Sequence, residues 1–273
     1  MIRVVKSPAP PKWLRLHGPA GRTALEAAYD AAPAACQQAG APALKPLRKI
    51  YARPTIKTQL RADQHRKCAY CETKFTHSSP GDVEHYRPKA GYQQGQHGPV
   101  LGPGYYWLGY EWSNLLFACE QCNRVCKRNR FPLREPADRA RNHHQHLHNE
   151  APLLLNPATG PDPETHLTFA QETAVGLTQE GEMTWRVCGL NRPDLLEARR
   201  DYLETVQDQL FLATILDANP PVLDLKVLVG LYGSEEKLSE KISAAQLNAR
   251  KLAQSAAPFA GMVRANFPHL PQH

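Results

Sequence analysis

Two Cys-x2-Cys pairs constrain this chain more than any other feature of its sequence. The first pair is Cys68 and Cys71, the second is Cys119 and Cys122, and 47 residues lie between Cys71 and Cys119. Each pair lets two thiolates face one ion, and two pairs complete a closed tetrahedral zinc site without an open position for water. The spacing therefore predicts a structural zinc that joins two distant segments and contributes on the order of 10 kcal/mol to folding.

The other three cysteines, Cys36, Cys126 and Cys188, follow no ligand spacing. Cys126 lies four residues beyond Cys122, so it is either a further ligand or, as we expect, a free thiol on a helix. Metal-like pairs with leftover thiols are typical of the reducing cytoplasm, which is the predicted location. The chain has no run of 18 apolar residues and no apolar signal segment near its N-terminus, so we expect no membrane span.

Charge is unevenly distributed along the chain. Residues 1–150 contain 23 Lys or Arg and 11 Asp or Glu, a net charge of +12, whereas residues 151–273 contain 10 and 15, a net charge of −5. A basic half around the cysteine pairs is the charge distribution expected of a protein that binds a phosphate backbone, although a soluble basic surface would look similar. The acidic half is not expected to touch nucleic acid.

The N-terminal segments predict short elements. Residues 1–20 are rich in proline and are expected to be extended, with Trp13 and Leu14 packed on the domain. The alanine-rich residues 23–39 predict a helix that is interrupted near Pro33, because proline removes a helical hydrogen bond.

A second predicted helix, residues 56–67, leads into Cys68 and turns Ile56 and Leu60 inward. Residues 91–104 are rich in Gly and Gln and predict a loop. Residues 139–150 form a polar connector with four histidines, which we interpret as a solvated linker, adventitious metal binding being the alternative.

The C-terminal part predicts a hairpin followed by helices. Residues 166–170 and 174–178 have the pattern of two paired strands. Asn191 is expected to cap a helix that begins with a proline, and apolar residues then recur at helical spacing. Residues 234–255 predict another helix, and residues 258–267 predict a last short one.

The segment Val-Glu-His-Tyr-Arg-Pro-Lys at 83–89 lies between the cysteine pairs and supplies candidate catalytic residues. Hydrolysis of a phosphodiester requires an activated water and a cation that stabilises charge in the transition state. With an ordinary pKa near ~6.5, His85 is the obvious general base. Although Glu84 and His85 alternate in a strand, both can reach one cleft at its end. Arg87 and Lys89 are expected to contact phosphate.

Basic residues also follow the second cysteine pair. Arg124, Lys127 and Arg128 lie at positions i, i+3 and i+4, which predicts one basic, phosphate-binding face of a short helix.

His85, Asn114 and Asn123, within the cysteine frame, resemble the ββα-metal (HNH) endonuclease superfamily. The resemblance implies that His85 is the general base, that Asn114 holds the loop that orients it, and that Asn123 ligates a catalytic divalent cation, Mg²⁺ or Mn²⁺. The superfamily usually has Asp before this His. Glu84 occupies that position here and would be the second cation ligand, with Asp82 as the alternative carboxylate.

More narrowly, the chain resembles the PtuB family, the HNH nuclease subunits of Septu-type and retron-associated anti-phage systems. The segment at 83–89 is far more specific than a general HNH match, and the similar segments span nearly the whole chain. These are residues 1–6, 68–72, 83–89, 106–108, 110–116, 131–133, 153–157, 163–167 and 190–193. The resemblance implies an HNH endonuclease that hydrolyses DNA phosphodiester bonds as a defence effector, with a PtuA-like ATPase subunit as its partner.

The expected fold class is α+β: a mainly helical chain around a ββα-metal nuclease motif with a zinc site of four cysteines. We expect a zinc-stabilised nuclease region with N-terminal helices at 1–150, a hairpin connector at 151–190 and a helical region at 191–273. The helical region either docks another molecule, which is a partner protein or a second copy of this chain, or it covers the nuclease core.

Two other functions fit the same sequence features. A metal-dependent RNase or tRNase would use the same basic half and the same catalytic residues. A non-catalytic, zinc-stabilised DNA-binding adaptor would explain the cysteines and the positive charge, but it would leave Glu84, His85 and Asn123 without a role.

Overall fold

The computed structural model describes residues 1–37, 44–215 and 224–272, and it is a mixed α and β structure with two small antiparallel sheets. The chain divides into two compact units. The first contains Met1–Thr168 and Val175–Asn191, and the second contains Phe169–Ala174 and Arg192–His273. The predicted three-part division of the chain stays a prediction. Within the described residues, no helix combines the length and apolar character needed to cross a membrane.

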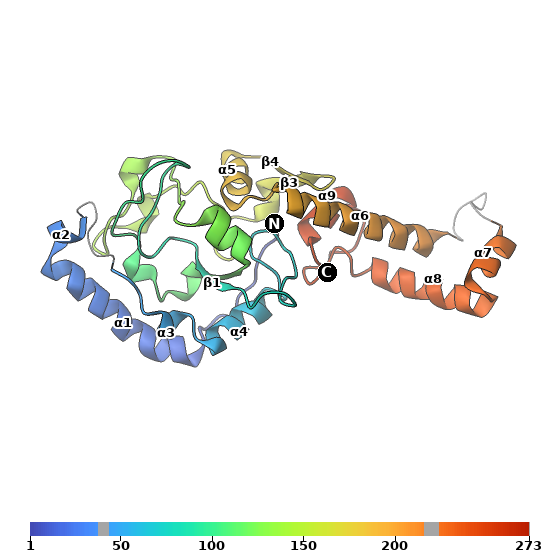
Figure 1. The fold of residues 1–273 in the computed structure, drawn as a ribbon, viewed down its shortest axis with the longest axis horizontal. Helices are drawn as coiled ribbons and strands as arrows, with labels where there is room; N and C mark the ends of the chain where they lie inside the picture. The colour runs from blue at the N-terminus through green and yellow to red at the C-terminus, as the bar shows by residue number, and fades with distance from the viewer. Residues whose placement is uncertain (38–43, 216–223, 273) are drawn as a thin grey trace. The chain divides into compact units, whose positions relative to one another are not determined.

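The first unit contains mostly short elements (Figure 1). Its helices and central strands are α1 (Lys12–Ala31), α2 (Pro33–Gln37), α3 (Arg48–Tyr51), α4 (Pro54–Asp63), β1 (Asp82–His85), β2 (Leu115–Ala118), the π-helix η3 (Gln121–Lys127) and α5 (Gln179–Cys188). Its 3-10 turns are η1 (Tyr106–Leu108), η2 (Trp112–Asn114), η4 (Pro136–Asp138), η5 (Leu147–Asn149) and η6 (Pro163–Thr165).

Strands β1 and β2 form the centre of the first unit. They pair antiparallel with His85 opposite Leu115 and Val83 opposite Phe117. All of β2 is buried. The outer edge of β2 is closed by Gln64, whose side chain donates to the Phe117 carbonyl at 2.7 Å and accepts from the Phe117 N–H at 2.7 Å. Because Gln64 directly follows α4, this contact places the end of that helix and the first cysteine pair beside the sheet.

The N-terminal prediction is wrong from Lys12 onward. Helix α1 begins there and continues through Pro19, although the sequence predicts an extended segment. Its packing explains this, since Gly18 lies so close to Tyr110 that an added Cβ would be 3.3 Å from the Tyr110 Cβ. Burial of one face of α1 thus outweighs the cost of about 3 kcal/mol for a proline inside a helix. The helical conformation from Lys12 onward is therefore determined by tertiary contacts and not by local sequence.

Other N-terminal predictions are confirmed. The helix predicted over 23–39 is interrupted before Pro33, and α2 follows; residues 38 and 39 lie outside the described residues. In α4, Ile56 and Leu60 are both fully buried, as predicted.

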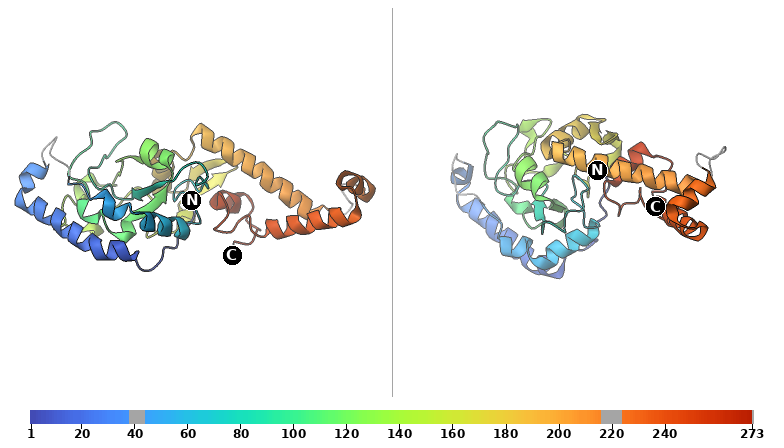
Figure 2. Two further views of the ribbon diagram at one scale, coloured as in Figure 1. Left: turned by 60° about the horizontal axis from the view of Figure 1, so that its bottom comes forward. Right: turned by 45° about the vertical axis from the view of Figure 1, so that its right-hand side comes forward.

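The second unit contains the longest helix of the described chain. Its helices are α6 (Pro193–Thr214), α7 (Leu225–Tyr232), α8 (Glu235–Ala249) and α9 (Ala260–Asn266). Helices α6 and α8 lie side by side, as both views of Figure 2 show, with Ala213 packed against Ala245 and Ala249. A second cluster joins Leu228 of α7 to Leu238 of α8. These are the apolar stripes that helical spacing predicts.

The C-terminal elements follow the prediction closely. Strands β3 (Leu167–Ala170) and β4 (Thr173–Gly176) form the expected hairpin, and Ser234 caps α8 by accepting from the Lys237 N–H. The helix cap predicted at Asn191 is wrong by one residue. Arg192 is the N-cap because Pro193 fixes the first helical position.

Helix α5 was not predicted from the sequence. Thr178 caps this helix by accepting from the Gly181 N–H, and Gly189 ends it in a left-handed conformation with φ of 61°. Both are recognisable start and stop signals.

Candidate functional site

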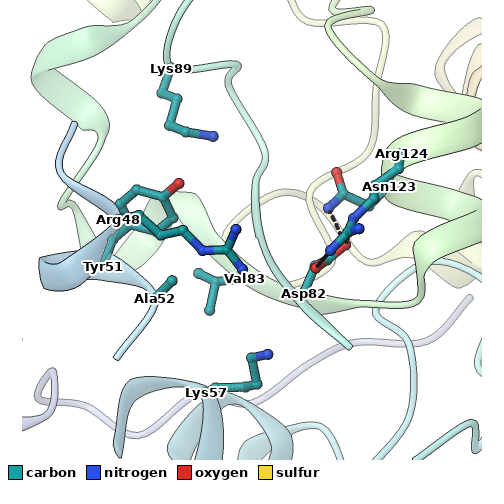
Figure 3. A pocket seen from close by; sticks show the side chains of 9 residues that line it. All are labelled: Arg48, Tyr51, Ala52, Lys57, Asp82, Val83, Lys89, Asn123 and Arg124. Carbon is teal, nitrogen blue, oxygen red and sulfur yellow. Dashed lines mark hydrogen bonds and ion pairs between the residues drawn. The ribbon is translucent and has the colours of Figure 1, made fainter. Parts of the chain in front are cut away.

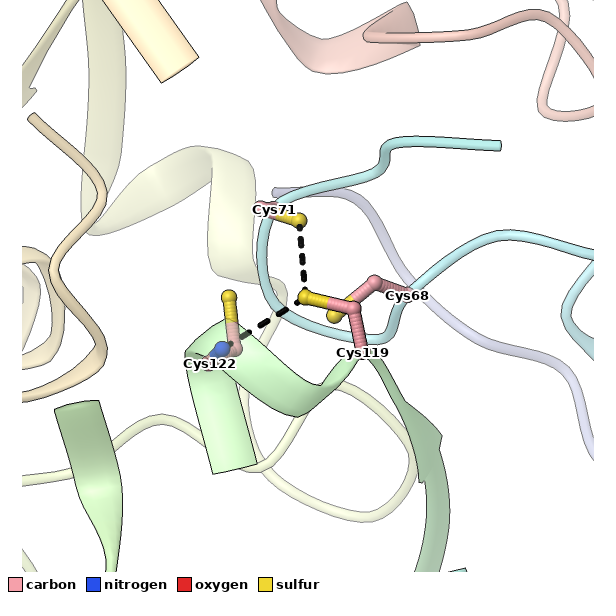
Figure 4. Close-up of side chains that lie close together, drawn as sticks. All are labelled: Cys68, Cys71, Cys119 and Cys122. Carbon is pink, nitrogen blue, oxygen red and sulfur yellow. Dashed lines mark hydrogen bonds between the residues drawn. The ribbon is translucent and has the colours of Figure 1, made fainter. Parts of the chain in front are cut away.

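Four buried cysteine sulfurs form the first cluster of the site (Figure 4). The Sγ atoms of Cys68, Cys71, Cys119 and Cys122 all lie within 4.8 Å of one another, and those of Cys71 and Cys119 are 3.8 Å apart. In a tetrahedral zinc site with bonds of about 2.3 Å, neighbouring sulfurs are roughly 3.8 Å apart. The predicted set of four is therefore brought together at a separation that fits one metal ion.

Local backbone geometry positions both cysteine pairs. In the first, the Cys68 N–H donates to the Thr73 carbonyl at 3.1 Å, and Glu72 adopts a positive φ of 62° to close the turn. In the second, the Cys122 N–H donates to the Cys119 Sγ at 3.4 Å, at the start of the π-helix η3. Cys119 directly follows β2, so the cluster fixes the orientation of η3 relative to the sheet.

His85 ends β1 and is buried, with 3% of its surface exposed. Its Nε2 lies 3.0 Å from the Gly109 carbonyl oxygen. Because a carbonyl only accepts, Nε2 carries the proton and Nδ1 carries the lone pair. Nδ1 has no hydrogen-bond partner among the described residues. Tyr51 packs edge-on against the ring, with the centroids 4.6 Å apart.

The electrostatic surroundings keep this imidazole neutral. Burial, together with the positive charges of Lys89 and Lys127, lowers the pKa of His85 well below its usual value, against the hydrogen bond to Gly109. A buried neutral histidine with an available nitrogen can accept a proton from a molecule in an adjoining cavity. His85 lines such a cavity of about 170 Å³ together with Glu84 and Asn123.

Asn114 is buried and holds the chain that follows His85. Its Oδ1 accepts from the Arg87 N–H at 2.7 Å, and its Nδ2 donates to the carbonyls of Arg87 and Leu108, both at 3.1 Å. The Asn114 carbonyl accepts from the Tyr86 N–H at 2.9 Å. The Asn114 side chain thus fixes both the segment after β1 and the turn before Gly109, whose carbonyl accepts the hydrogen bond from His85 Nε2.

Asn123 lies on η3, close to the first residue of β1. Its Nδ2 donates to Asp82 Oδ2 at 3.0 Å, and Arg124 binds both oxygens of the same carboxylate at 2.6 and 2.8 Å. Burial raises the pKa of Asp82, but the hydrogen bonds and charge of Arg124 outweigh it, so the pKa of Asp82 lies below its ordinary value. Asp82 is therefore an ionised carboxylate in direct contact with Asn123.

Glu84 and Lys127 form a buried ion pair, with Lys127 Nζ 2.6 Å from Glu84 Oε1. Lys127 is fully buried and also donates to the His85 carbonyl at 3.1 Å. The predicted basic face of a helix is therefore wrong for Lys127, which does not reach solvent. The reason is the π-helical geometry: the Arg128 N–H donates to the Asn123 carbonyl five residues back, so Arg124 and Lys127, three residues apart, do not share a face as they would in an α-helix.

A second cavity, of about 190 Å³, shares Lys89, Asn123 and Arg124 with the first (Figure 3). Arg48 from α3, Lys57 from α4 and Lys89 surround it, and Asp82, Asn123 and Arg124 lie opposite them in the figure. Lys89 also lines the cavity at His85. Its ammonium lies 5.2 Å from the centre of the Tyr51 ring. Burial lowers the pKa of Lys89 despite the attraction of Glu84.

Four residues of the site were not identified from the sequence: Arg48, Lys57, Tyr51 and Gly109. The positive charge of residues 1–150 was the only general signal for the two cations, because α3 and α4 approach β1 only in the folded chain. Gly109 acts through its carbonyl, which has no side-chain signal.

Two other predicted phosphate contacts lie in different places. Arg87 is bound to Glu150, with both Nε and one Nη 3.0 Å from Oε2, and it lines neither cavity. Arg128 is exposed, follows the end of η3 with a positive φ of 53°, and lines the cavity at His85.

Comparison with known proteins gives two similarities. The chain is similar to Septu protein PtuB of Bacillus mycoides (strain KBAB4), with 33% identity over 198 residues. The aligned region covers 71% of this chain and 64% of that PtuB, so the chain spans somewhat less than two thirds of the length of this relative.

It is also similar to Septu protein PtuA of the same strain, with 32% identity over 134 residues that cover 49% of this chain and 18% of PtuA. No protein-family model and no solved structure matched the chain.

Proposed function

We propose that this chain is an HNH-type, metal-dependent endonuclease that hydrolyses DNA phosphodiester bonds. The observation that carries the proposal is His85. It is a neutral, buried imidazole whose Nδ1 has no hydrogen-bond partner among the described residues, and it lines a polar cavity together with Glu84, Asn123 and Lys89. Two short antiparallel strands followed by a helix that begins in the cysteine cluster support the ββα-metal assignment.

In this proposal His85 acts as the general base. Nδ1 takes a proton from the attacking water, and the Gly109 carbonyl stabilises the resulting imidazolium through the hydrogen bond from Nε2. Asn114 is a positioning residue, because it holds both the segment after His85 and the turn before Gly109. Lys89, which lines both cavities, is placed to bind the phosphate near His85.

The cations that line the cavity of about 190 Å³ are proposed to add to this phosphate-binding surface. Arg48 and Lys57 come from separate helices and converge on one polar cavity, the arrangement expected for binding a phosphate backbone. Arg128, which lines the smaller cavity, is proposed to add a further phosphate contact.

A catalytic divalent cation, Mg²⁺ or Mn²⁺, fits the oxygen donors near His85. Asn123 with Glu84 would hold it, and Asp82 is the alternative carboxylate because it already contacts Asn123. Carboxylate and amide oxygens are the ligands that such hard cations prefer. When bound, the cation would supply positive charge to stabilise the developing charge on the phosphate.

The ion in the cysteine cluster is proposed to be zinc, with a structural role. Four thiolates at tetrahedral separation complete its coordination, which leaves no position for water or substrate.

The similarity to PtuB supports a role in Septu anti-phage defence. We propose a PtuA-like ATPase as the protein partner and the cytoplasm as the location. Co-purification of such an ATPase with tagged chain tests the partner, and elution of this chain alone, or as a homo-oligomer, would contradict it.

The deciding experiment compares the parent chain with His85→Ala on plasmid DNA, linear DNA and RNA, with Mg²⁺ or Mn²⁺ and with EDTA. A general base contributes ~10² to 10⁴ in rate, so we expect a loss of that size with the fold and DNA affinity retained. The exposed His77→Ala variant is the matched control and should cleave like the parent.

Three results would contradict the proposal in different ways. Parental cleavage by His85→Ala removes His85 from the mechanism. Cleavage of RNA alone identifies an RNase. DNA binding without any cleavage by the parent chain favours the adaptor function.

A further inference from the structure

Helix α1 and the histidine-rich connector meet at a cluster of three side chains, Asp30, His143 and His144. His144 Nε2 lies 2.8 Å from Asp30 Oδ1, and His143 Nε2 lies 3.5 Å from Asp30 Oδ2. One ligand atom from each of the three residues lies within 4.8 Å of the others. Both Nε2 atoms thus converge on one carboxylate that is more than 110 residues away in the sequence.

These separations suit a metal ion. With bonds of about 2.0–2.1 Å from zinc to nitrogen or oxygen, neighbouring ligand atoms in a tetrahedral site lie roughly 3.3 Å apart. The two observed distances lie on either side of this value.

The surroundings of the cluster hold His143 in position. Its Nδ1 lies 2.6 Å from the hydroxyl of the fully buried Tyr106, and the ring packs edge-on against Tyr29. When Nδ1 carries the proton and donates it to the Tyr106 oxygen, the Nε2 lone pair faces the carboxylate. Metal-ligating histidines are commonly oriented by such a hydrogen bond at the other ring nitrogen.

We propose that Asp30, His143 and His144 form a second metal site, which binds a divalent transition-metal ion such as Zn²⁺. Two imidazoles and one carboxylate favour an ion of intermediate softness over Mg²⁺ or Ca²⁺. Asp30 and His144 are about half exposed or more, at 49% and 63%, so water completes the coordination and the ion exchanges with solvent. Binding ties α1 to the connector, and it does not depend on the proposed nuclease activity.

The connector itself supplies the matched control. His146 and His148 belong to the same tract, are exposed, and have ring centroids 5.2 Å apart. They are not part of the three-residue cluster. An adventitious histidine tract would use all four histidines, whereas the proposed site requires His143 and His144 together with Asp30 from another element.

The test measures zinc binding to the full chain with the cysteine site already loaded. Equilibrium dialysis against Zn²⁺ should give one further equivalent for the parent and for the double variant His146→Ala/His148→Ala. Asp30→Asn and the double variant His143→Ala/His144→Ala should lose that equivalent. Tyr106→Phe, which removes only the hydroxyl, should weaken binding by about 10-fold or more.

Thermal unfolding and a spectroscopic probe provide two further readouts. Added Zn²⁺ should raise the melting temperature of the parent by a few degrees and leave that of Asp30→Asn unchanged. Co²⁺ in this site should give ligand-field absorption without the thiolate charge-transfer bands of the cysteine site. The proposal is overturned if the parent binds no further equivalent, if Asp30→Asn and His143→Ala/His144→Ala retain it, or if it disappears with His146 and His148.

Discussion

The two compact units of this chain are stabilised in different ways. The second unit consists mainly of helices that pack apolar stripes on one another, as Ala213 on α6 does against Ala245 on α8. The first unit has short strands and turns, and it buries polar and charged groups that pair with one another, such as Glu84 with Lys127. Among the described residues, Arg199 is the one buried charged side chain of the second unit.

This difference shows how a unit built from short strands, short helices and turns can still have a defined structure. The two paired strands contain four residues each, too few to be stable alone, and the segments on either side are irregular. Long-range polar contacts such as those of Asn114, together with the cysteine cluster, fix these segments in place. Such contacts also orient the candidate catalytic residues, which apolar packing alone does less specifically.

The strongest test of the comparison is Cys119→Ser. Removal of one ligand should eliminate most of a metal contribution on the order of 10 kcal/mol, and the first unit should lose its tertiary structure. Circular dichroism should show weaker near-ultraviolet signals, while the helices of the second unit persist in the far-ultraviolet. Cys126→Ser, on the same π-helix but outside the cluster, is the control. A parental melting temperature for Cys119→Ser would refute a structural metal site.

Truncation of Leu238 tests the second unit in the same way. Leu238 is 2% exposed in the cluster that joins α7 and α8, so Leu238→Ala should cost about 2–5 kcal/mol through lost burial and a cavity. Denaturant unfolding measures this loss, and DNA cleavage at low denaturant should stay parental. Leu231→Ala, at a position that is 73% exposed, should change stability by less than about 0.5 kcal/mol. Loss of cleavage in Leu238→Ala would mean that the two units do not behave separately.

A smaller effect is expected for Asn114→Ala. This change leaves the Arg87 N–H and the Arg87 carbonyl without the Asn114 side chain as their partner, which costs about 1–3 kcal/mol for a buried polar group. Cleavage should also slow, because the segment around His85 loses its anchor. Equal stability and rate in Asn114→Ala and in the exposed control Ser113→Ala would show that this network does not position the site.

The smallest effect belongs to the exposed ion pair of Arg124 with Asp82. Arg124→Ala should lower stability at pH 7 only slightly, because water screens the exposed Arg124 side of the pair. The pKa of Asp82 is lower in the folded chain than its ordinary value, so the stabilisation is present above pH ~4 and is lost as the pH falls further. Urea unfolding at pH 7, 5 and 3.5 should show this trend.

In the Asp82→Asn background the same substitution should remove only the exposed ion pair of Arg124 with Glu120, so its effect on stability should be smaller than in the parent. If the loss of stability caused by Arg124→Ala were the same at every pH, Arg124 would contribute through packing instead of through its charge.

The fold was predictable wherever local spacing carries the signal. The core residues of α4, the hairpin β3–β4 and the start of α8 at Ser234 all follow from periodicity and capping. Helix α1 did not, because its packing against Tyr110 overrides the prolines of the N-terminal segment. The spacing rule for Arg124, Lys127 and Arg128 failed because it assumes an α-helix and the chain forms a π-helix there.

The candidate site divides in the same way. The sequence by itself identified the four cysteines as one candidate set of metal ligands, since the spacing within two short chelating pairs is enough to recognise them. It also identified His85, Asn114 and Asn123 as candidates from their place in the cysteine frame.

Only the tertiary structure decided which partners these residues have. It bound His85 Nε2 to the Gly109 carbonyl, buried Lys127 against Glu84, and brought Arg48 and Lys57 to the cavity beside Asn123. The physical reason is that pairing of charges and protons depends on distances across the fold, whereas chelating spacing is a property of a few consecutive residues.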